Sequence, residues 1–172
     1  MMPRIELHRL SDDGLVPNND RVPLVVYRGA LAAETCTDSH FEALFARHGW
    51  SNAWVNGIYP FHHYHATVHE VLGLARGRAD VQFGGPSGPI VPVAAGDAVL
   101  IPAGVGHCRR SASRDLCVVG AYPGGADWDL VRAIPEARAA ALALLARVPP
   151  PSTDPVLGGP FDCAVLSRAA GA

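Results

Sequence analysis

Short apolar runs separated by turn residues fill the middle of the chain, between residues 54 and 122. These runs are rich in β-branched and aromatic residues, and Gly, Pro or Asp interrupts them about every eight to twelve residues. In "RADVQFGG", residues 78–85, Ala79, Val81 and Phe83 alternate with polar neighbours, which is typical of a strand with one solvated face. This rhythm favours an antiparallel sandwich or barrel, and thus an all-β fold, over a βαβ protein.

The residues before this region predict two strands and a helix. "IELHRL" at 5–10 and "VPLVVYRG" at 22–29 are strand-like runs on either side of a polar loop. "TDSHFEALFARHGW", residues 37–50, has apolar side chains at helical spacing, Thr37 or Asp38 as the N-cap, and Gly49 as the stop. We therefore expect an N-terminal helix, with His48 on its packed stripe.

The pattern becomes helical again after Gly125. "IPEARAAALALLARV", residues 134–148, begins with Pro135 in its first turn and continues with strong helix formers, until "PPP" at 149–151 ends it. The run "FDCAVLSR", residues 161–168, predicts a closing strand. No repeat or second domain is visible, so we expect one domain over residues 1–172. It comprises N-terminal strands and a helix (1–53), a barrel core (54–122), and a C-terminal helix with a closing strand (123–172).

The charge of the chain restricts its partners. Its 172 residues carry a formal net charge of -2, and all 14 basic residues are arginines that form no cluster along the sequence. This balance argues against nucleic acid or an anionic membrane as the main partner. The first residues lack the apolar segment of a secretory signal, and no apolar run approaches the roughly 18 residues of a membrane span. We therefore expect a cytoplasmic protein.

The four cysteines fit that compartment. Cys36, Cys108, Cys117 and Cys163 are scattered and form no CxxC pair, which predicts reduced thiols. A disulfide between Cys108 and Cys117, across a hairpin, is the alternative.

Histidines gather in "FHHYHATVHE", residues 61–70, which holds four of the eight in the chain. Side chains two residues apart in a strand share a face, so His63 and His65 would point the same way, about 7 Å apart, and His62 away from them. Glu70 would open the next strand across a tight turn, which can return its carboxylate to the same site. Further along, His107 follows a predicted strand at 98–101 and the turn "PAG", and would open another strand at the same depth.

These residue types predict a metal site. Imidazoles beside a carboxylate suit Fe(II), Mn, Ni, Zn or Cu better than a soft thiolate site does. Cys108 follows His107 directly and would face the opposite way, so it is a poor candidate ligand. We expect one divalent transition metal.

Two segments resemble the motifs of the cupin superfamily. "GIYPFHHYHATVHEVLGLARG" at 57–77 is similar to the first motif, G(x)5HxH(x)4E(x)6G, and "GDAVLIPAGVGH" at 96–107 to the second, G(x)5PxG(x)2H. All nine fixed residues match: Gly57, His63, His65, Glu70, Gly77, Gly96, Pro102, Gly104 and His107. Ser111 replaces an Asn that usually lies four residues beyond the last His and is not a ligand in the family.

The resemblance is wider than these motifs. "NGIYPFHHYHATVHEVLG", "GAYPGGADWDL" and "RVPPPSTDPVLGG" are similar to the YjlB-type branch of small single-domain cupins, from about Leu24 to nearly the C-terminus. Members of that branch are functionally unassigned. The resemblance implies a double-stranded β-helix, or jelly-roll barrel, with the N-terminal and C-terminal helices packed outside. It also implies four metal ligands: His63, His65, Glu70 and His107. His62 and His69 would be structural or surface residues, or would orient a ligand from behind.

The expected reaction depends on the metal. Four protein ligands on a six-coordinate ion leave two adjacent sites, which suit dioxygen activation or polarisation of a carbonyl. The neighbours Tyr59, Phe61 and Leu72 would line a mainly apolar pocket for a small organic molecule. A dioxygenase-type oxidoreductase is the first hypothesis. A metal-dependent isomerase or lyase and a non-catalytic metal- or ligand-binding cupin are the alternatives. Small cupins commonly pair, so a homodimer is also expected.

Overall fold

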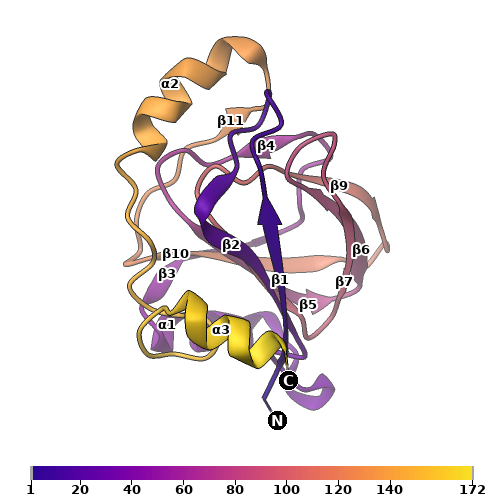
Figure 1. The fold of residues 1–172 in the computed structure, drawn as a ribbon. Helices are drawn as coiled ribbons and strands as arrows, with labels where there is room; N and C mark the ends of the chain where they lie inside the picture. The colour runs from indigo at the N-terminus through magenta and orange to yellow at the C-terminus, as the bar shows by residue number, and fades with distance from the viewer. Residues whose placement is uncertain (1, 172) are drawn as a thin grey trace.

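Two antiparallel sheets form the body of the protein in a computed structural model that describes residues 2–171 (Figure 1). The six-stranded sheet has the order β1 (Arg4–Leu10), β2 (Asn19–Arg28), β8 (Ala98–Ile101), β5 (Glu70–Arg76), β10 (Cys117–Pro123) and β3 (Trp50–Asn56). The five-stranded sheet has the order β11 (Val131–Arg132), β4 (His63–Tyr64), β9 (His107–Ala112), β6 (Arg78–Phe83) and β7 (Ile90–Ala94). The predicted all-β fold is confirmed, and the two sheets form a jelly-roll barrel.

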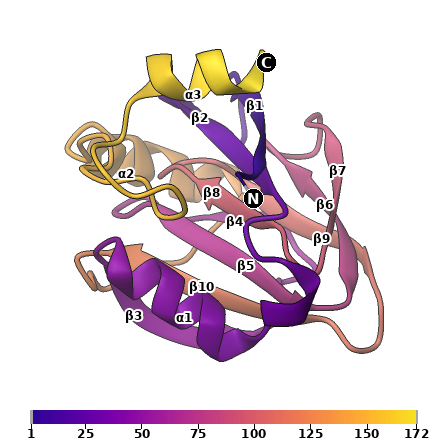
Figure 2. The same cartoon turned by 90° about the horizontal axis from the view of Figure 1, so that it is seen from below.

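The helices lie outside the barrel. They are α1 (Asp38–Arg47), α2 (Pro135–Leu145) and α3 (Cys163–Ala170), and a short 3-10 turn, η1 (Ala33–Thr35), precedes α1. Helix α1 packs on β3, β5 and β10, whereas α3 lies along β1 and β2 (Figure 2). Helix α2 stands at the opposite end of the molecule from both chain termini (Figure 1). The external N-terminal and C-terminal helices are therefore confirmed.

Local capping explains where two of these helices begin. The Thr37 side chain accepts a hydrogen bond of 3.2 Å from the backbone N–H of His40, which makes Thr37 the N-cap of α1. Pro135 occupies the first turn of α2, where its missing N–H costs no helical hydrogen bond.

The six-stranded sheet is covered on both faces, and β5 shows how. Leu72 and Leu74 face inward, into a core between the sheets, whereas Val71 and Ala75 face outward, into a core beneath α1. This two-sided burial explains why "EVLGLA" is almost continuously apolar. A Cβ on Gly73 would lie 2.3 Å from the ring of Phe41, so the close approach of α1 requires glycine there.

The predicted closing strand at 161–168 is wrong, because these residues form most of α3. The Asp162 side chain accepts hydrogen bonds from the backbone N–H groups of Ala164 and Val165, at 2.7 and 3.4 Å, and so caps a helix. Leu166 is buried in the same core as Val71 and Ala75, on the outward face of the six-stranded sheet. The Asp162 cap and the burial of Leu166 together favour a helix over a strand here.

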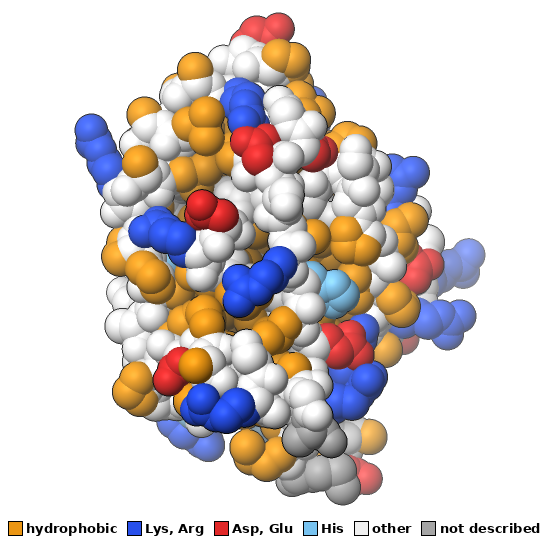
Figure 3. All heavy atoms as spheres, viewed as in Figure 1, with side chains coloured by type: hydrophobic (Ala, Val, Ile, Leu, Met, Phe, Trp, Pro, Cys, Tyr) orange, Lys and Arg blue, Asp and Glu red, His pale blue; other side chains and the backbone are white. Residues whose placement is uncertain are grey.

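The predicted thiols and charges agree with the structure. All four cysteines are free, and Cys108 and Cys117 lie on β9 and β10, which belong to different sheets. Arginines are interspersed with acidic side chains on the face seen in Figure 3 and form no single basic patch there. Within residues 2–171, no helix has the length and apolar character needed to cross a membrane.

Candidate metal centre

A cavity of about 450 Å³ opens between the two sheets. Its wall includes residues from β3, β4, β5, β9 and β10, together with the 57–60 loop and the segment around Trp128. His63, His65, Glu70 and His107 all line it, so the structure brings the four sequence-predicted metal ligands to one cavity.

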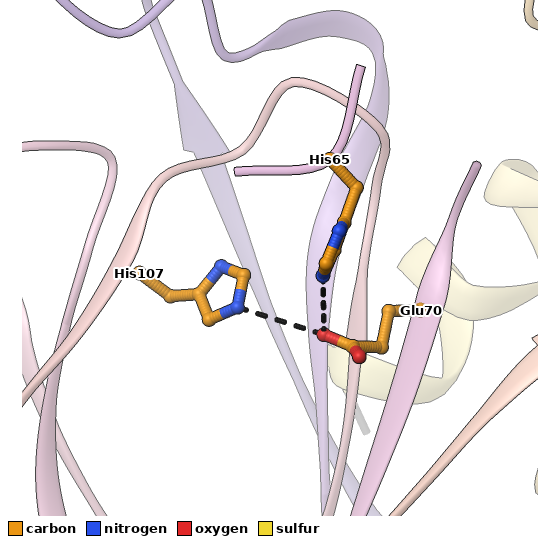
Figure 4. Close-up of side chains that lie close together, drawn as sticks. All are labelled: His65, Glu70 and His107. Carbon is orange, nitrogen blue, oxygen red and sulfur yellow. Dashed lines mark hydrogen bonds and ion pairs between the residues drawn. The ribbon is translucent and has the colours of Figure 1, made fainter. Parts of the chain in front are cut away.

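Three of these residues lie in one tight group. The ligand atoms of His65, Glu70 and His107 are all within 4.8 Å of one another, and the three side chains are buried. One carboxylate oxygen of Glu70, Oε2, lies 3.2 Å from Nε2 of His65 and 3.5 Å from Nε2 of His107 (Figure 4). His65 directly follows β4, while Glu70 opens β5 and His107 opens β9. The turns before and between these strands therefore converge on the site.

The fourth predicted ligand, His63, lies at the side of this group. It pairs with His107 across β4 and β9, and the two ring centres are 4.0 Å apart. The ring centres of His63 and His65 are 6.2 Å apart. His63 is thus adjacent to the other three residues, and its role as a ligand stays a prediction.

All three imidazoles are held in the same way by backbone carbonyl groups. Nδ1 of His63 donates to the Phe61 carbonyl at 2.9 Å, and Nδ1 of His107 to the Val105 carbonyl at 3.2 Å. Nδ1 of His65 donates to the carbonyl of Asp129. A carbonyl oxygen can only accept, so each Nδ1 carries a proton, and the lone pair of each ring in its neutral form is on Nε2. This is the tautomer that a metal site built on Nε2 requires.

Burial and mutual charge shift the pKa values of these groups. Burial would raise the pKa of Glu70, but His65 and His107 hold it well below its usual range. Burial would lower the pKa of His65, but the Glu70 carboxylate and Asp129 together outweigh burial and raise the pKa. Burial and the neighbouring His107 lower the pKa of His63 to about 3. His63 is therefore neutral at physiological pH, with a free lone pair.

The second oxygen of Glu70 is held by residues that sequence reasoning missed. The Tyr122 hydroxyl donates to Oε1 of Glu70 at 2.8 Å, and Nε1 of Trp54 donates to the same hydroxyl at 2.8 Å. Burial and the Glu70 carboxylate raise the pKa of Tyr122, so the phenol stays protonated and remains a donor. Strand alternation from Val118 through Gly120 would have pointed Tyr122 inward, and this was the available signal.

Asp129 is a second residue that was missed. Its carboxylate accepts hydrogen bonds from the backbone N–H groups of Ala66 and Thr67, at 2.9 and 3.0 Å, and from the Thr67 hydroxyl at 2.6 Å. Its own carbonyl accepts from His65. Asp129 therefore fixes both the imidazole and the loop that carries it, and no motif spacing pointed to this role.

His62 and His69 do not line the cavity. His69 uses both ring nitrogens: Nε2 donates to the Pro149 carbonyl at 2.8 Å, and Nδ1 accepts from the N–H of Ala103 at 2.9 Å. His62 has a buried Nδ1 with no hydrogen-bond partner among the described residues. Burial and Arg110 lower its pKa. His69 thus joins two loops near the site, and an orienting role for either histidine stays a prediction.

Aromatic side chains surround the entrance to the cavity. Tyr59 lines the cavity and stacks on Phe61, with ring centres 4.9 Å apart. Phe61 supports Tyr59 from behind and is not itself part of the lining. Leu72 lines the cavity as predicted, and Trp128 and Arg109, which sequence reasoning did not select, line it as well.

A jelly roll whose cavity gathers the residues of both motifs defines a protein of the cupin class. The chain is 45% identical over 147 residues to the uncharacterised protein YjlB of Bacillus subtilis (strain 168), covering 86% of this chain and 87% of that one. The chain therefore belongs to the YjlB family of cupins. No family model matches the chain.

Several solved structures show a more distant likeness. Acireductone dioxygenase from Bacillus anthracis, solved with a cadmium ion in its active centre, aligns with 72% of this chain and 80% of its own at 15% identity and a TM-score of 0.38. Procruciferin, an 11S globulin from Brassica napus, aligns with 72% of this chain at 17% identity and a TM-score of 0.41. Oxalate decarboxylase aligns with 77% of this chain at 13% identity and a TM-score of 0.36. The chain spans only 30% of procruciferin and 28% of oxalate decarboxylase.

Proposed function

We propose that this protein is a metal-dependent cupin that acts on a small organic molecule. In this proposal one divalent transition metal, from the group Fe, Mn, Ni, Zn and Cu, is held by four side chains: His63, His65, Glu70 and His107. The observation that carries it is the shared Nδ1–H tautomer of the three imidazoles, together with the Nε2 atoms of His65 and His107 that lie beside one buried carboxylate.

The donor set fits such an ion. An Nε2 lone pair that faces a carboxylate oxygen at 3.2 or 3.5 Å is repelled unless a proton or a cation lies between them. Imidazole nitrogens and a carboxylate oxygen together suit borderline divalent metals. The carbonyl groups that accept from the Nδ1 atoms are the partners that typically orient metal-bound histidines.

The reaction we propose is an oxidation of dioxygenase type. When bound, the metal would supply open coordination sites for dioxygen or for a chelating substrate. The protein would supply a cavity of about 450 Å³ with mainly apolar and aromatic walls, in which Tyr59, Leu72 and Trp128 exclude water from the substrate. A metal-dependent isomerase or lyase uses the same centre to polarise a carbonyl, and a non-catalytic cupin would only bind its ligand.

Anaerobic purification followed by elemental analysis tests the proposal. We expect about one transition metal per chain. We also expect substrate-dependent oxygen uptake in a screen of small aromatic and keto acids. Bound zinc or nickel without oxygen uptake would favour the isomerase or the binding protein. Less than a tenth of an equivalent of any of the five metals, after reconstitution with each, would refute the metal centre.

A cytoplasmic homodimer is part of the same proposal. The four free cysteines support a reducing compartment. Light scattering at micromolar concentration tests the dimer, and a monomeric mass would contradict it.

A further inference from the structure

Arg109 brings a positive charge to the cavity. It lies two residues after His107 on β9, so the two side chains share a face of the strand, and both line the cavity. Its backbone N–H donates to the Tyr59 carbonyl at 3.0 Å. Among residues 2–171 its guanidinium has no carboxylate within 4.0 Å and no side-chain hydrogen bond, whereas Arg28 is paired with both Glu6 and Asp97. Arg109 is partly exposed and lines the cavity, so a ligand in the cavity can reach its guanidinium.

No acidic side chain in the lining offsets this charge. Glu70 is the one carboxylate among the lining residues that the structure describes, and it is only 3% exposed. Its two oxygens are already engaged by Tyr122 and by the two histidines. A divalent metal would add further positive charge. The cavity is therefore electrostatically suited to an anion.

The entrance has two aromatic walls. Tyr59 stacks on Phe61, and Trp128 stacks on Tyr122, with ring centres 6.2 Å apart and planes inclined by 18°. Tyr59 is 48% exposed and Trp128 is 45% exposed, although both line the cavity. Large aromatic surfaces left open at a cavity mouth favour a flat ligand, which stacks on them and removes them from water.

We propose that the cavity binds a planar organic anion, an aromatic or conjugated carboxylate. Its carboxylate pairs with the guanidinium of Arg109, its flat body lies against Tyr59 and Trp128, and its far end reaches toward the metal centre. Only this last contact rests on the proposed function, since the first two involve side chains of the chain alone. Arg109 then determines specificity, because a bidentate guanidinium pair accepts a carboxylate and rejects the neutral amide of the same shape.

Calorimetric titration with cinnamate and its neutral isostere cinnamamide tests this inference. Each probe is titrated into the protein as purified and into the protein after removal of metal with a chelator. We expect cinnamate to bind at least about tenfold more tightly than cinnamamide in both forms. Arg109→Gln should reduce this preference to below about twofold. The control is Arg110→Gln, which removes an exposed arginine next along the strand that does not line the cavity, and it should keep the full preference.

The outcomes separate this inference from the proposed function. Equal affinity for acid and amide in the unmodified protein, or a preference that survives in Arg109→Gln, overturns the inference even if metal is bound. A preference that depends on Arg109, in a protein that takes up none of the five metals even after reconstitution, supports the inference and refutes the metal centre. Thermal melts of both variants show whether any loss reflects unfolding.

Discussion

The phenol of Tyr122 donates a hydrogen bond of 2.8 Å to Oε1 of Glu70, while Oε2 of the same carboxylate faces His65 and His107. The two oxygens of one buried carboxylate thus have different partners. The phenol is in turn held by Nε1 of Trp54 at 2.8 Å. Because the carboxylate cannot rotate without breaking the bond to Tyr122, this contact aims Oε2 at the imidazoles.

Tyr122→Phe should therefore weaken metal binding by about tenfold and leave the fold intact. The lost hydrogen bond to a buried carboxylate should also lower the free energy of unfolding by about 2 kcal/mol. Competition with a chromogenic chelator measures the metal affinity, and urea denaturation measures the stability.

A matched control is Tyr27→Phe, since the Tyr27 hydroxyl makes a similar buried bond of 2.7 Å to Asp154, away from the cavity. This variant should lose stability and keep the metal affinity of the unmodified protein. An unchanged metal affinity in Tyr122→Phe would mean that the contact does not position Glu70.

His63→Ala and His107→Ala should each remove the metal and leave a folded protein. In each ring Nδ1 donates to a nearby carbonyl, so Nε2 is the atom available to the metal. Each change removes that Nε2 ligand. Elemental analysis and circular dichroism provide the measurement. His48→Ala is the control, because His48 contacts the Pro155 carbonyl outside the cavity and should retain full metal.

Full metal occupancy in both site variants would contradict the ligand assignment. Full occupancy in His63→Ala alone would restrict the ligands to the three residues within 4.8 Å of one another.

His69→Ala should reduce stability without removing the metal. The change leaves the N–H of Ala103 and the carbonyl of Pro149 without their partner, which costs about 2 kcal/mol. Thermal or urea unfolding measures this loss, and elemental analysis should still give the stoichiometry of the unmodified protein. A stable variant that has lost its metal would instead assign His69 to the site.

Asp129→Asn should lower stability in a pH-dependent way. Burial would raise the pKa of Asp129, but hydrogen bonds from Thr67 and Ala66 hold the pKa below its ordinary value of 3.8. A depressed carboxyl pKa gives stability that is fully present above the unfolded value and is lost as the pH falls through the folded value. The variant should therefore be about 1–2 kcal/mol less stable at pH 7, and the difference should shrink below about pH 4.

Urea unfolding of metal-free protein between pH 7 and pH 3 measures this difference. Asp20→Asn is the control, because Asp20 is exposed and its carboxylate makes no hydrogen bond or ion pair with the residues that the structure describes. A deficit in Asp129→Asn that stays constant across the whole pH range would show that the charge of the carboxylate is not what stabilises the loop.

Local pattern predicted most of the elements. The alternation in residues 78–83, the N-cap at Thr37 and the proline at the start of α2 all appear in the structure as expected. Each is a short-range feature, in which neighbouring residues decide the backbone conformation. The predicted closing strand at 161–168 was wrong, because a local apolar pattern alone did not decide the conformation there. That prediction used only the apolar run in 161–168, whereas in the structure Asp162 caps a helix whose Leu166 is buried in the core.

The site also combines features that the sequence predicted with features that only the structure shows. Motif spacing alone predicted that His63, His65, Glu70 and His107 belong to one site, and the structure brings all four to one cavity. Only the tertiary structure decided that three of them form a tight group with His63 at its side, that Tyr122 and Asp129 fix Glu70 and His65, and that Arg109 shares their cavity. These contacts join residues up to 64 positions apart in the chain. Tyr122 and Glu70 lie on neighbouring strands of one sheet, and His63 and His107 lie on neighbouring strands of the other. These contacts therefore depend on which distant segments pair and pack, and no local pattern of the sequence encodes that pairing.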